Sequence, residues 1–206
     1  LARIAPGKQW DEQILAPMRQ VARAIEHGQF ARAGQTTQLV VGAAGESDRE
    51  VMGAADRGYR ELKMARVYYS AMQPLPGTPL AERAPVPFER EHRLYQVDFL
   101  LRSYGFALDE IPFDPTGALP LHTDPKTLWA HQHPERFPVE VNKASLAELV
   151  RIPGIGPRSA KRLLDMRRQH NLRDVAALRA AGASWKIASP FVLLDGQPAE
   201  RQLRLC

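Results

Sequence analysis

The sequence predicts an α/β unit followed by an all-α segment of short paired helices. Three observations predict this. Residues 1–106 alternate between helical and strand-like hydrophobic patterns. Residues 107–138 are rich in proline and turn residues, which is typical of a linker, here with one short helix. Residues 139–206 contain short helical patterns separated by glycines. We therefore expect three segments with these boundaries.

The first segment is expected to contain three helices and two strands. They are predicted, in chain order, over residues 11–28, 36–43, 46–62, 65–72 and 88–105. The order helix, strand, helix, strand, helix favours parallel α/β packing. The last helix is expected to bury Leu94, Val97, Phe99, Leu100 and Tyr104.

A glycine-containing loop follows the first predicted strand. Gly42 and Gly45 allow a ligand to approach the backbone, and the next helix would offer free N–H groups and a positive dipole to a carboxylate or phosphate. The alternative is a plain turn, which such a glycine pair more often makes.

Two motifs in this segment resemble the radical S-adenosylmethionine superfamily. "VVGAAGESDRE" is similar to its G-x-P-G-E-T turn, with Ala44 in place of proline and Ser47 in place of threonine. "VYYSAMQPLPGTPL" is similar to a later strand of the superfamily that ends in P-x-P-G-T-P. The resemblance implies the second half of a partial (β/α) barrel, in which Gly42, Gly45 and Glu46 help to hold S-adenosylmethionine.

The cysteine content departs from that superfamily, whose members hold a [4Fe–4S] cluster through three spaced cysteines. The only cysteine is Cys206, the last residue. The chain alone therefore cannot assemble the cluster, and we assign no catalytic residue. Because the chain begins with Leu1, we expect it to be a fragment of a longer enzyme that supplies the cluster; loss of the site is the alternative.

Composition and charge narrow the possible partners. No apolar run is long enough to span a bilayer and no secretion signal opens the chain, so no membrane partner is expected. The absence of internal disulfides favours a reducing compartment, and we expect a cytoplasmic location. Residues 136–206 hold 13 Lys/Arg and 6 Asp/Glu, a formal net charge of +7, whereas residues 1–135 sum to −2. A basic C-terminal third favours a polyanionic partner, although a solvated basic surface would look the same.

The stretch "VRIPGIGPRSAKRLLDMRR" predicts a helix-hairpin-helix. A first helix with Leu146, Leu149 and Val150 facing inward ends at Pro153, and a second begins at Pro157. The glycines permit a tight hairpin, and Ile155 fills the space between the helices. The second helix should bury Ala160, Leu163, Leu164 and Met166. An ordinary αα-hairpin is the alternative.

The second helix begins with several cationic side chains. Arg158, Lys161 and Arg162 would surround its unpaired N–H groups and form an anion site. The stretch resembles the helix-hairpin-helix family of DNA repair and replication proteins. That resemblance implies DNA contacts around Ile155, through the amides of Gly154, Gly156 and Ser159. It also implies a monovalent cation on the carbonyls of Val150, Ile152 and Ile155.

Residues 171–192 are interpreted as a degenerate second copy of the motif. Leu172, Val175 and Leu178 would form its first helix, and Gly182 its hairpin. Trp185, Phe191 and Val192 would close the core. Asp174 lies at the spacing of a catalytic aspartate in helix-hairpin-helix DNA glycosylases, but it also suits a helix start.

The linker contains one further candidate site. Asp124 should cap a short helix with Pro125 at its first position, and Trp129 and Phe137 could fix that helix to a neighbouring domain. Three histidines are candidate metal ligands, but without spaced partners they are more simply surface residues. They are His122, His131 and His133.

Taken together, the motifs resemble a family of DNA modification or repair radical S-adenosylmethionine proteins, whose genes tend to accompany a uracil-DNA glycosylase-like protein. The resemblance implies a fragment of such an enzyme that docks on DNA non-specifically. Two alternatives are a non-catalytic DNA-binding or interaction module, in which the α/β part is only scaffold, and a DNA glycosylase that uses Asp174.

Overall fold

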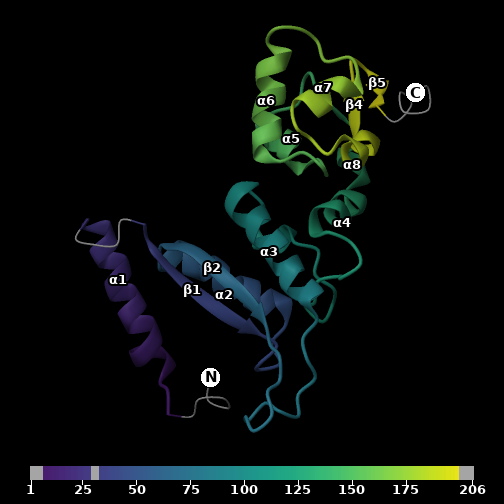
Figure 1. Cartoon of the computed structure of the whole chain (residues 1–206). Coiled ribbons are helices and arrows are strands. Elements are labelled where there is room, and N and C mark those ends of the chain that lie inside the picture. The colour runs from purple at the N-terminus through teal and green to yellow at the C-terminus, as the bar shows by residue number, and fades with distance from the viewer. Residues whose placement is uncertain (1–6, 29–32, 200–206) are drawn as a thin grey trace. The chain divides into compact units, whose positions relative to one another are not determined.

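The computed structural model describes residues 7–28 and 33–199 (Figure 1). The chain divides into two compact units. Unit 1 contains residues 1–98 and 113–122, and unit 2 contains residues 99–112 and 123–206. The fold is mixed α/β, as predicted. No helix in the described part of the chain is both long and apolar enough to cross a membrane.

Unit 1 contains a two-stranded parallel sheet with helices before, between and after its strands. Its elements are η1 (Asp11–Leu15), α1 (Ala16–Glu26), β1 (Gln35–Val41), α2 (Asp48–Glu61), β2 (Met64–Ala71) and the larger part of α3 (Phe88–Ser103). β1 pairs with β2 from Gln35↔Met64 to Val41↔Ala71. This is the predicted element order and strand orientation. The described residues do not show a barrel.

The beginning of α2 is set by a capping box. Ser47 Oγ accepts a hydrogen bond from Glu50 N at 3.3 Å, and the Glu50 carboxylate accepts one from Ser47 N at 2.8 Å. Two N–H groups at the helix start are thereby satisfied by side chains. The helix buries Val51, Met52 and Ala55, and the sheet buries Val41 and Val67.

Helix α3 buries Leu94, Val97 and Leu100, as predicted. The prediction that Phe99 lies in the core is wrong, because its side chain is 45% exposed and its ring is contacted by the Arg102 guanidinium at 5.4 Å. Phe99 lies off the stripe that Leu94 and Val97 define at helical spacing. Asp98 is fully buried instead and accepts hydrogen bonds from the hydroxyls of Tyr59 and Tyr69.

Unit 2 contains the paired helices and a small sheet. Its elements after α3 are η2 (Leu108–Glu110), α4 (Pro125–Gln132), η3 (Pro134–Arg136), β3 (Val139–Glu140), α5 (Leu146–Arg151), α6 (Pro157–Arg167), α7 (Val175–Ala180), α8 (Trp185–Ala188), η4 (Ser189–Phe191), β4 (Val192–Leu194) and β5 (Gln197–Pro198). The sheet has the order β3-β4-β5, with β3 parallel and β5 antiparallel to β4.

The prediction that residues 139–206 are all-α is wrong, because the three short strands β3, β4 and β5 lie there. The turn that joins β4 to β5 does carry a local signal. β4 and β5 are joined through Asp195 and Gly196, which both have positive φ, at 53° and 77°. An Asp-Gly pair between strands favours this two-residue hairpin turn.

The core of unit 2 is formed by residues from all four paired helices and from the sheet. It includes Leu149, Val150, Ile152, Ile155, Ala160, Leu163, Leu172, Leu178, Ala188, Val192 and Leu194. Leu164, Met166, Val175, Trp185 and Phe191 are partly buried against it. The prediction that Leu146 faces inward is wrong, because this side chain is 39% exposed at the first position of α5.

Helix α4 begins as predicted, with Asp124 accepting a hydrogen bond from Thr127 N at 2.9 Å and Pro125 at the first position. Trp129 is 1% exposed, and its ring meets those of Phe106 at 5.2 Å and Phe137 at 6.2 Å. These contacts all lie within unit 2 and fix α4 there. The three segment boundaries expected from the sequence stay a prediction.

Candidate nucleic-acid interface

The hairpin between α5 and α6 has the geometry that its sequence predicts. A capping box of Ser145 and Glu148 begins α5. Gly154 has φ of 77°, a left-handed conformation that favours glycine. Ile155 is 1% exposed and belongs to the core, and its N–H donates to Ile152 O at 3.1 Å. The chain thus reverses over a buried isoleucine and enters α6 with Pro157 at its first position.

A second, shorter hairpin packs against the first. α7 and α8 are separated by Gly182, whose φ is 76°, so a second helical hairpin is present where it was predicted. The prediction that Leu172 belongs to its first helix is wrong, because α7 begins at Val175. Ser184 N donates to Gly154 O at 2.8 Å. A Cβ atom on Gly154 would lie 2.5 Å from Ser184 O and 3.1 Å from Ala188 N. The backbones of the two hairpins are therefore in direct contact at Gly154.

Several backbone N–H groups at the first hairpin are unpaired in the described part of the chain, including that of Ser159, a residue with 7% exposure. Among residues 7–28 and 33–199, no acceptor is found for the N–H groups of Gly154, Gly156, Arg158 and Ser159. The next N–H, that of Ala160, donates to Gly156 O at 2.8 Å. Unpaired N–H groups at the beginning of a helix carry partial positive charge and can donate to an anion.

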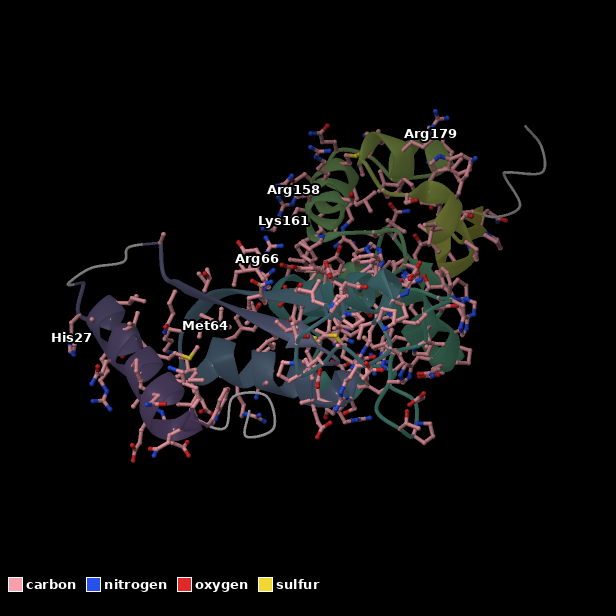
Figure 2. All side chains as sticks on the ribbon, turned by 60° about the horizontal axis from the view of Figure 1, so that its bottom comes forward. His27, Met64, Arg66, Arg158, Lys161 and Arg179 are labelled. Atoms are coloured by element: carbon pink, nitrogen blue, oxygen red, sulfur yellow. The ribbon has the colours of Figure 1, made fainter. Side chains whose placement is uncertain are left out.

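Cationic side chains project from the same end of α6. Arg158, Lys161 and Arg162 are all exposed, and none of them has an acidic partner within the described part of the chain. Figure 2 shows Arg158 and Lys161 next to each other on the outer side of α6. Exposed, unpaired cations beside free N–H groups can neutralise phosphates without first breaking an ion pair.

Two other arginines near the motif are used inside the protein. Arg167 donates to the carbonyls of Val141 at 2.9 Å and Ala144 at 2.5 Å. Arg151 makes a two-bond ion pair with Glu110, at 2.6 and 3.0 Å, and its guanidinium lies 4.4 Å from the Phe106 ring centre. These side chains hold unit 2 together and are unsuited to bind a ligand.

The ion pair determines the acidity of Glu110. Burial alone would raise the pKa of this carboxyl, but the bonds from Arg151 and from Ala107 N outweigh it and hold the pKa below 4.5. Glu110 is therefore charged at neutral pH.

Lys126, in α4, contacts the hairpin between α5 and α6. Its side chain is buried, with 8% of the residue exposed, and Nζ donates to Ile155 O at 2.6 Å. Nζ also lies 4.6 Å from the centre of the Tyr104 ring. Burial lowers the pKa of Lys126 to about 7, against the opposing effect of Asp124. Burial also raises the pKa of the Tyr104 phenol.

The three carbonyls that the resemblance assigns to a monovalent cation have different partners. Ile155 O accepts from Lys126 Nζ, and Ile152 O accepts from Ile155 N. The carbonyl of Val150 lies at the end of α5 and has no partner among the described residues. A cation on all three stays a prediction.

We did not identify Lys126 or Glu110 from the sequence, and the sequence indicated Tyr104 only as a core residue of the helix over residues 88–105. A signal existed for Lys126, because it shares a helix face at spacing i, i+3, i+4 with the buried Trp129 and Ala130. No sequence pattern indicates the pairing of Glu110 with Arg151, which are 41 residues apart.

Asp174 acts as the N-cap of α7. Its carboxylate accepts from Ala176 N at 2.9 Å and from Ala177 N at 3.3 Å. The interpretation of this residue as a helix start is confirmed. The histidines show no metal-binding arrangement: His133 Nδ1 lies 3.1 Å from Glu135 Oε1, and the His131 ring packs near Phe191. No group of three or more His, Cys, Asp or Glu suited to a metal occurs in the described ranges.

The loop after β1 in unit 1 satisfies its own N–H donors. The Glu46 carboxylate accepts from Gly42 N and, at 3.0 Å, from Ala44 N. At the start of α2, Arg49 N donates to Gly117 O at 2.9 Å and Glu50 N to Ser47 Oγ. The expectation that this loop offers free N–H groups to a carboxylate or phosphate is thus wrong for these four donors, because the chain supplies its own acceptors.

The positions assigned to S-adenosylmethionine lie together at this loop. Gly42 has φ of 86°, and a Cβ atom there would collide with Val86 Cγ2. Gly45 and Glu46 border a shallow hollow that is also lined by Asp48 and Arg90. With Glu46 bonded to the loop amides, these residues fit a ligand carboxylate poorly, and the described residues offer no cysteine to a [4Fe–4S] cluster.

Comparison with known proteins identifies a motif in unit 2. The family model of the helix-hairpin-helix motif matches residues 136–180. The chain therefore carries a helix-hairpin-helix motif, and such motifs typically bind DNA. No curated protein and no solved structure matches the chain at a significant level.

Proposed function

We propose that unit 2 binds DNA through its phosphate backbone, with little preference for sequence. The observation that carries this proposal is the coincidence, at one end of α6, of free hairpin N–H groups with exposed and unpaired cations. The donors are the amides of Gly154, Gly156, Arg158 and Ser159, and the cations are Arg158, Lys161 and Arg162.

The chemistry of these groups supports phosphate contacts rather than base reading. Backbone amides and a helix start fix the position of a phosphate but carry no sequence information. Recognition of base edges commonly uses a helix or ribbon inserted in the major groove, with side chains that contact several bases. The free groups here form one compact cluster at the hairpin, which suits one or two phosphates.

The proposal is tested by removing two cations that have no structural partner. The variant Arg158→Gln/Lys161→Gln keeps long polar side chains on the exposed face of α6. Log affinity falls with log salt, and each lost phosphate contact makes this negative slope shallower by about 0.9. We therefore expect the slope of the double variant to be shallower by about 1.8. Binding to a fluorescent duplex would be followed by anisotropy over a series of salt concentrations.

A matched control removes the same charge elsewhere. Arg57→Gln/Lys63→Gln changes two exposed cations of unit 1. We expect this variant to keep the wild-type salt slope. If the two double variants weaken binding equally, only the net charge matters and the hairpin is not the docking site.

A second proposal concerns unit 1, and it is favoured by the parallel pairing of β1 and β2 through α2. Together with the two motifs of Gly42–Ser47 and Pro74–Pro79, this arrangement is what a place for unit 1 in the barrel of a radical S-adenosylmethionine protein requires. A role in DNA modification or repair and a uracil-DNA glycosylase-like partner come from the resemblance alone. When bound, S-adenosylmethionine and its cluster would supply radical chemistry. Gly45 and Glu46 line the hollow that the cofactor would occupy, and Glu46 would first have to release the amides of Gly42 and Ala44.

Equilibrium dialysis of the chain against S-adenosylmethionine tests the second proposal separately from DNA binding. Saturable binding that Glu46→Ala weakens would support it. If neither this chain nor a longer chain with three spaced cysteines binds S-adenosylmethionine, unit 1 is a scaffold and the protein is a non-catalytic DNA-binding module.

A further inference from the structure

The hairpin carbonyl of Ile155 is a buried acceptor that needs a partner. Ile155 is 1% exposed, and a buried carbonyl without a hydrogen bond is unfavourable. Within the helix-hairpin-helix the residue four positions onward is Ser159, whose N–H does not bond this carbonyl. The partner comes instead from Lys126, which lies 29 residues away on α4 and whose Nζ is 2.6 Å from Ile155 O.

Lys126 Nζ is surrounded by a carbonyl oxygen and an aromatic ring, and it has no carboxylate as an ion-pair partner in the described part of the chain. The Tyr104 ring faces Nζ at 4.6 Å, as an aromatic ring faces a cation. No carboxylate within residues 7–28 and 33–199 forms a salt bridge with Lys126, and the Asp124 carboxylate is bonded to Thr127 N. A carbonyl oxygen and an aromatic face are groups that an alkali-metal ion also accepts.

Tyr104 links this arrangement to the next hairpin glycine. A Cβ atom on Gly156 would lie 3.2 Å from the Tyr104 hydroxyl. Lys126 and Tyr104 therefore contact the two consecutive residues, Ile155 and Gly156, that lead into α6. Any displacement of Ile155 and Gly156 would move the free N–H groups that begin α6.

We propose that Lys126 is a positioning residue of the DNA interface, whose side-chain nitrogen takes at Ile155 O the place that a monovalent cation would otherwise fill. The hairpin is then held by an internal group, and its affinity for DNA does not depend on which monovalent cation is in solution. This inference rests on the proposed binding of DNA at the hairpin.

The test compares two salts at equal ionic strength and at about pH 6, below the pKa of about 7 of Lys126. Potassium can bind between carbonyls, whereas tetramethylammonium is too large to do so. Duplex binding would be measured by anisotropy for the full chain and for Lys126→Met. The exposed Lys8→Met variant controls for the loss of one positive charge.

We expect the wild type and Lys8→Met to bind equally well in both salts. Lys126→Met should bind about five- to tenfold more weakly in tetramethylammonium, because the hairpin carbonyl has lost its partner, and potassium should restore part of the affinity. Thermal unfolding of each variant would show whether unit 2 remains folded. Lys126→Gln, whose amide can still donate to Ile155 O, replaces Lys126→Met if the latter does not fold, and it should retain more of the wild-type affinity.

Three results would overturn the inference. The first is a wild type that binds more weakly in tetramethylammonium, since an external cation would then be required. The second is a Lys126→Met variant with wild-type affinity in both salts. The third is an equal loss in both salts, which would mark Lys126 as a packing residue. Arg158→Gln/Lys161→Gln separates the two proposals: if it binds like the wild type, the DNA interface itself is wrong.

Discussion

Substitution of Gly154 by alanine should destabilise unit 2 far more than substitution of Gly156. The new methyl group at Gly154 would lie 2.5 Å from Ser184 O, in a backbone conformation with φ of 77°. It would also push apart the two atoms of the Ser184 N–Gly154 O hydrogen bond, which are 2.8 Å apart. At Gly156, φ is −95° and the nearest atom is the Tyr104 hydroxyl at 3.2 Å.

The magnitude follows from these contacts. The left-handed conformation costs a non-glycine residue about 1 kcal/mol. Loss of the hydrogen bond between the hairpins adds about 1 kcal/mol, and the displacement of backbone by the methyl group adds about 1 kcal/mol or more. We therefore expect Gly154→Ala to lower the free energy of unfolding by about 3 kcal/mol, and Gly156→Ala by less than about 1 kcal/mol.

Urea unfolding followed by tryptophan fluorescence measures this difference. Trp129 and Trp185 both lie in unit 2 and report on it, whereas Trp10 lies in unit 1. Equal midpoints for the two variants would refute the contact between the hairpins at Gly154. The expected instability also means that a variant of both glycines is a poor test of DNA binding, and that the charge variants are cleaner.

Two further predictions concern side chains that hold unit 2 together. Because the pKa of Glu110 is lowered below 4.5 in the folded state, its pair with Arg151 contributes stability above that pH and loses it as the pH falls through the folded pKa. Glu110→Gln should be less stable than the wild type by about 1–2 kcal/mol at neutral pH. In urea titrations this difference should shrink as the pH falls through the folded pKa of Glu110, and parallel pH profiles would contradict it. Asp174→Ala should cost about 1 kcal/mol through loss of the α7 cap, with Asp174→Asn close to the wild type. If Asp174→Asn were as unstable as Asp174→Ala in thermal unfolding, the cap assignment would be wrong, and a base-excision activity lost in Asp174→Asn would instead support the glycosylase alternative.

The local features of the fold could be predicted from the sequence because they depend on neighbouring residues. Asp124 with Pro125 and the spacing of Ile155 between glycines determine a helix start and a hairpin over a few positions. The exposure of Phe99 and Leu146 could not be predicted, since it depends on which elements pack against the faces of α3 and α5.

The candidate site could likewise be predicted only in its local features. The cations of α6 and the glycines of the hairpin follow from one continuous stretch of sequence. By contrast, the partner of Ile155 O comes from Lys126, and the acceptor for the Gly42 and Ala44 amides is the side chain of Glu46. A sequence pattern gives donors and acceptors but does not show which of them the folded chain pairs with one another.

The most direct test of the central claim is a titration of this chain with duplex DNA over a range of salt concentrations. Phosphate contacts at the hairpin predict that log affinity falls linearly with log salt. They also predict that this fall is shallower, by about 1.8 in the slope, for Arg158→Gln/Lys161→Gln. Affinity that does not change with salt, or a slope that is unchanged in this variant, would contradict DNA docking through α6.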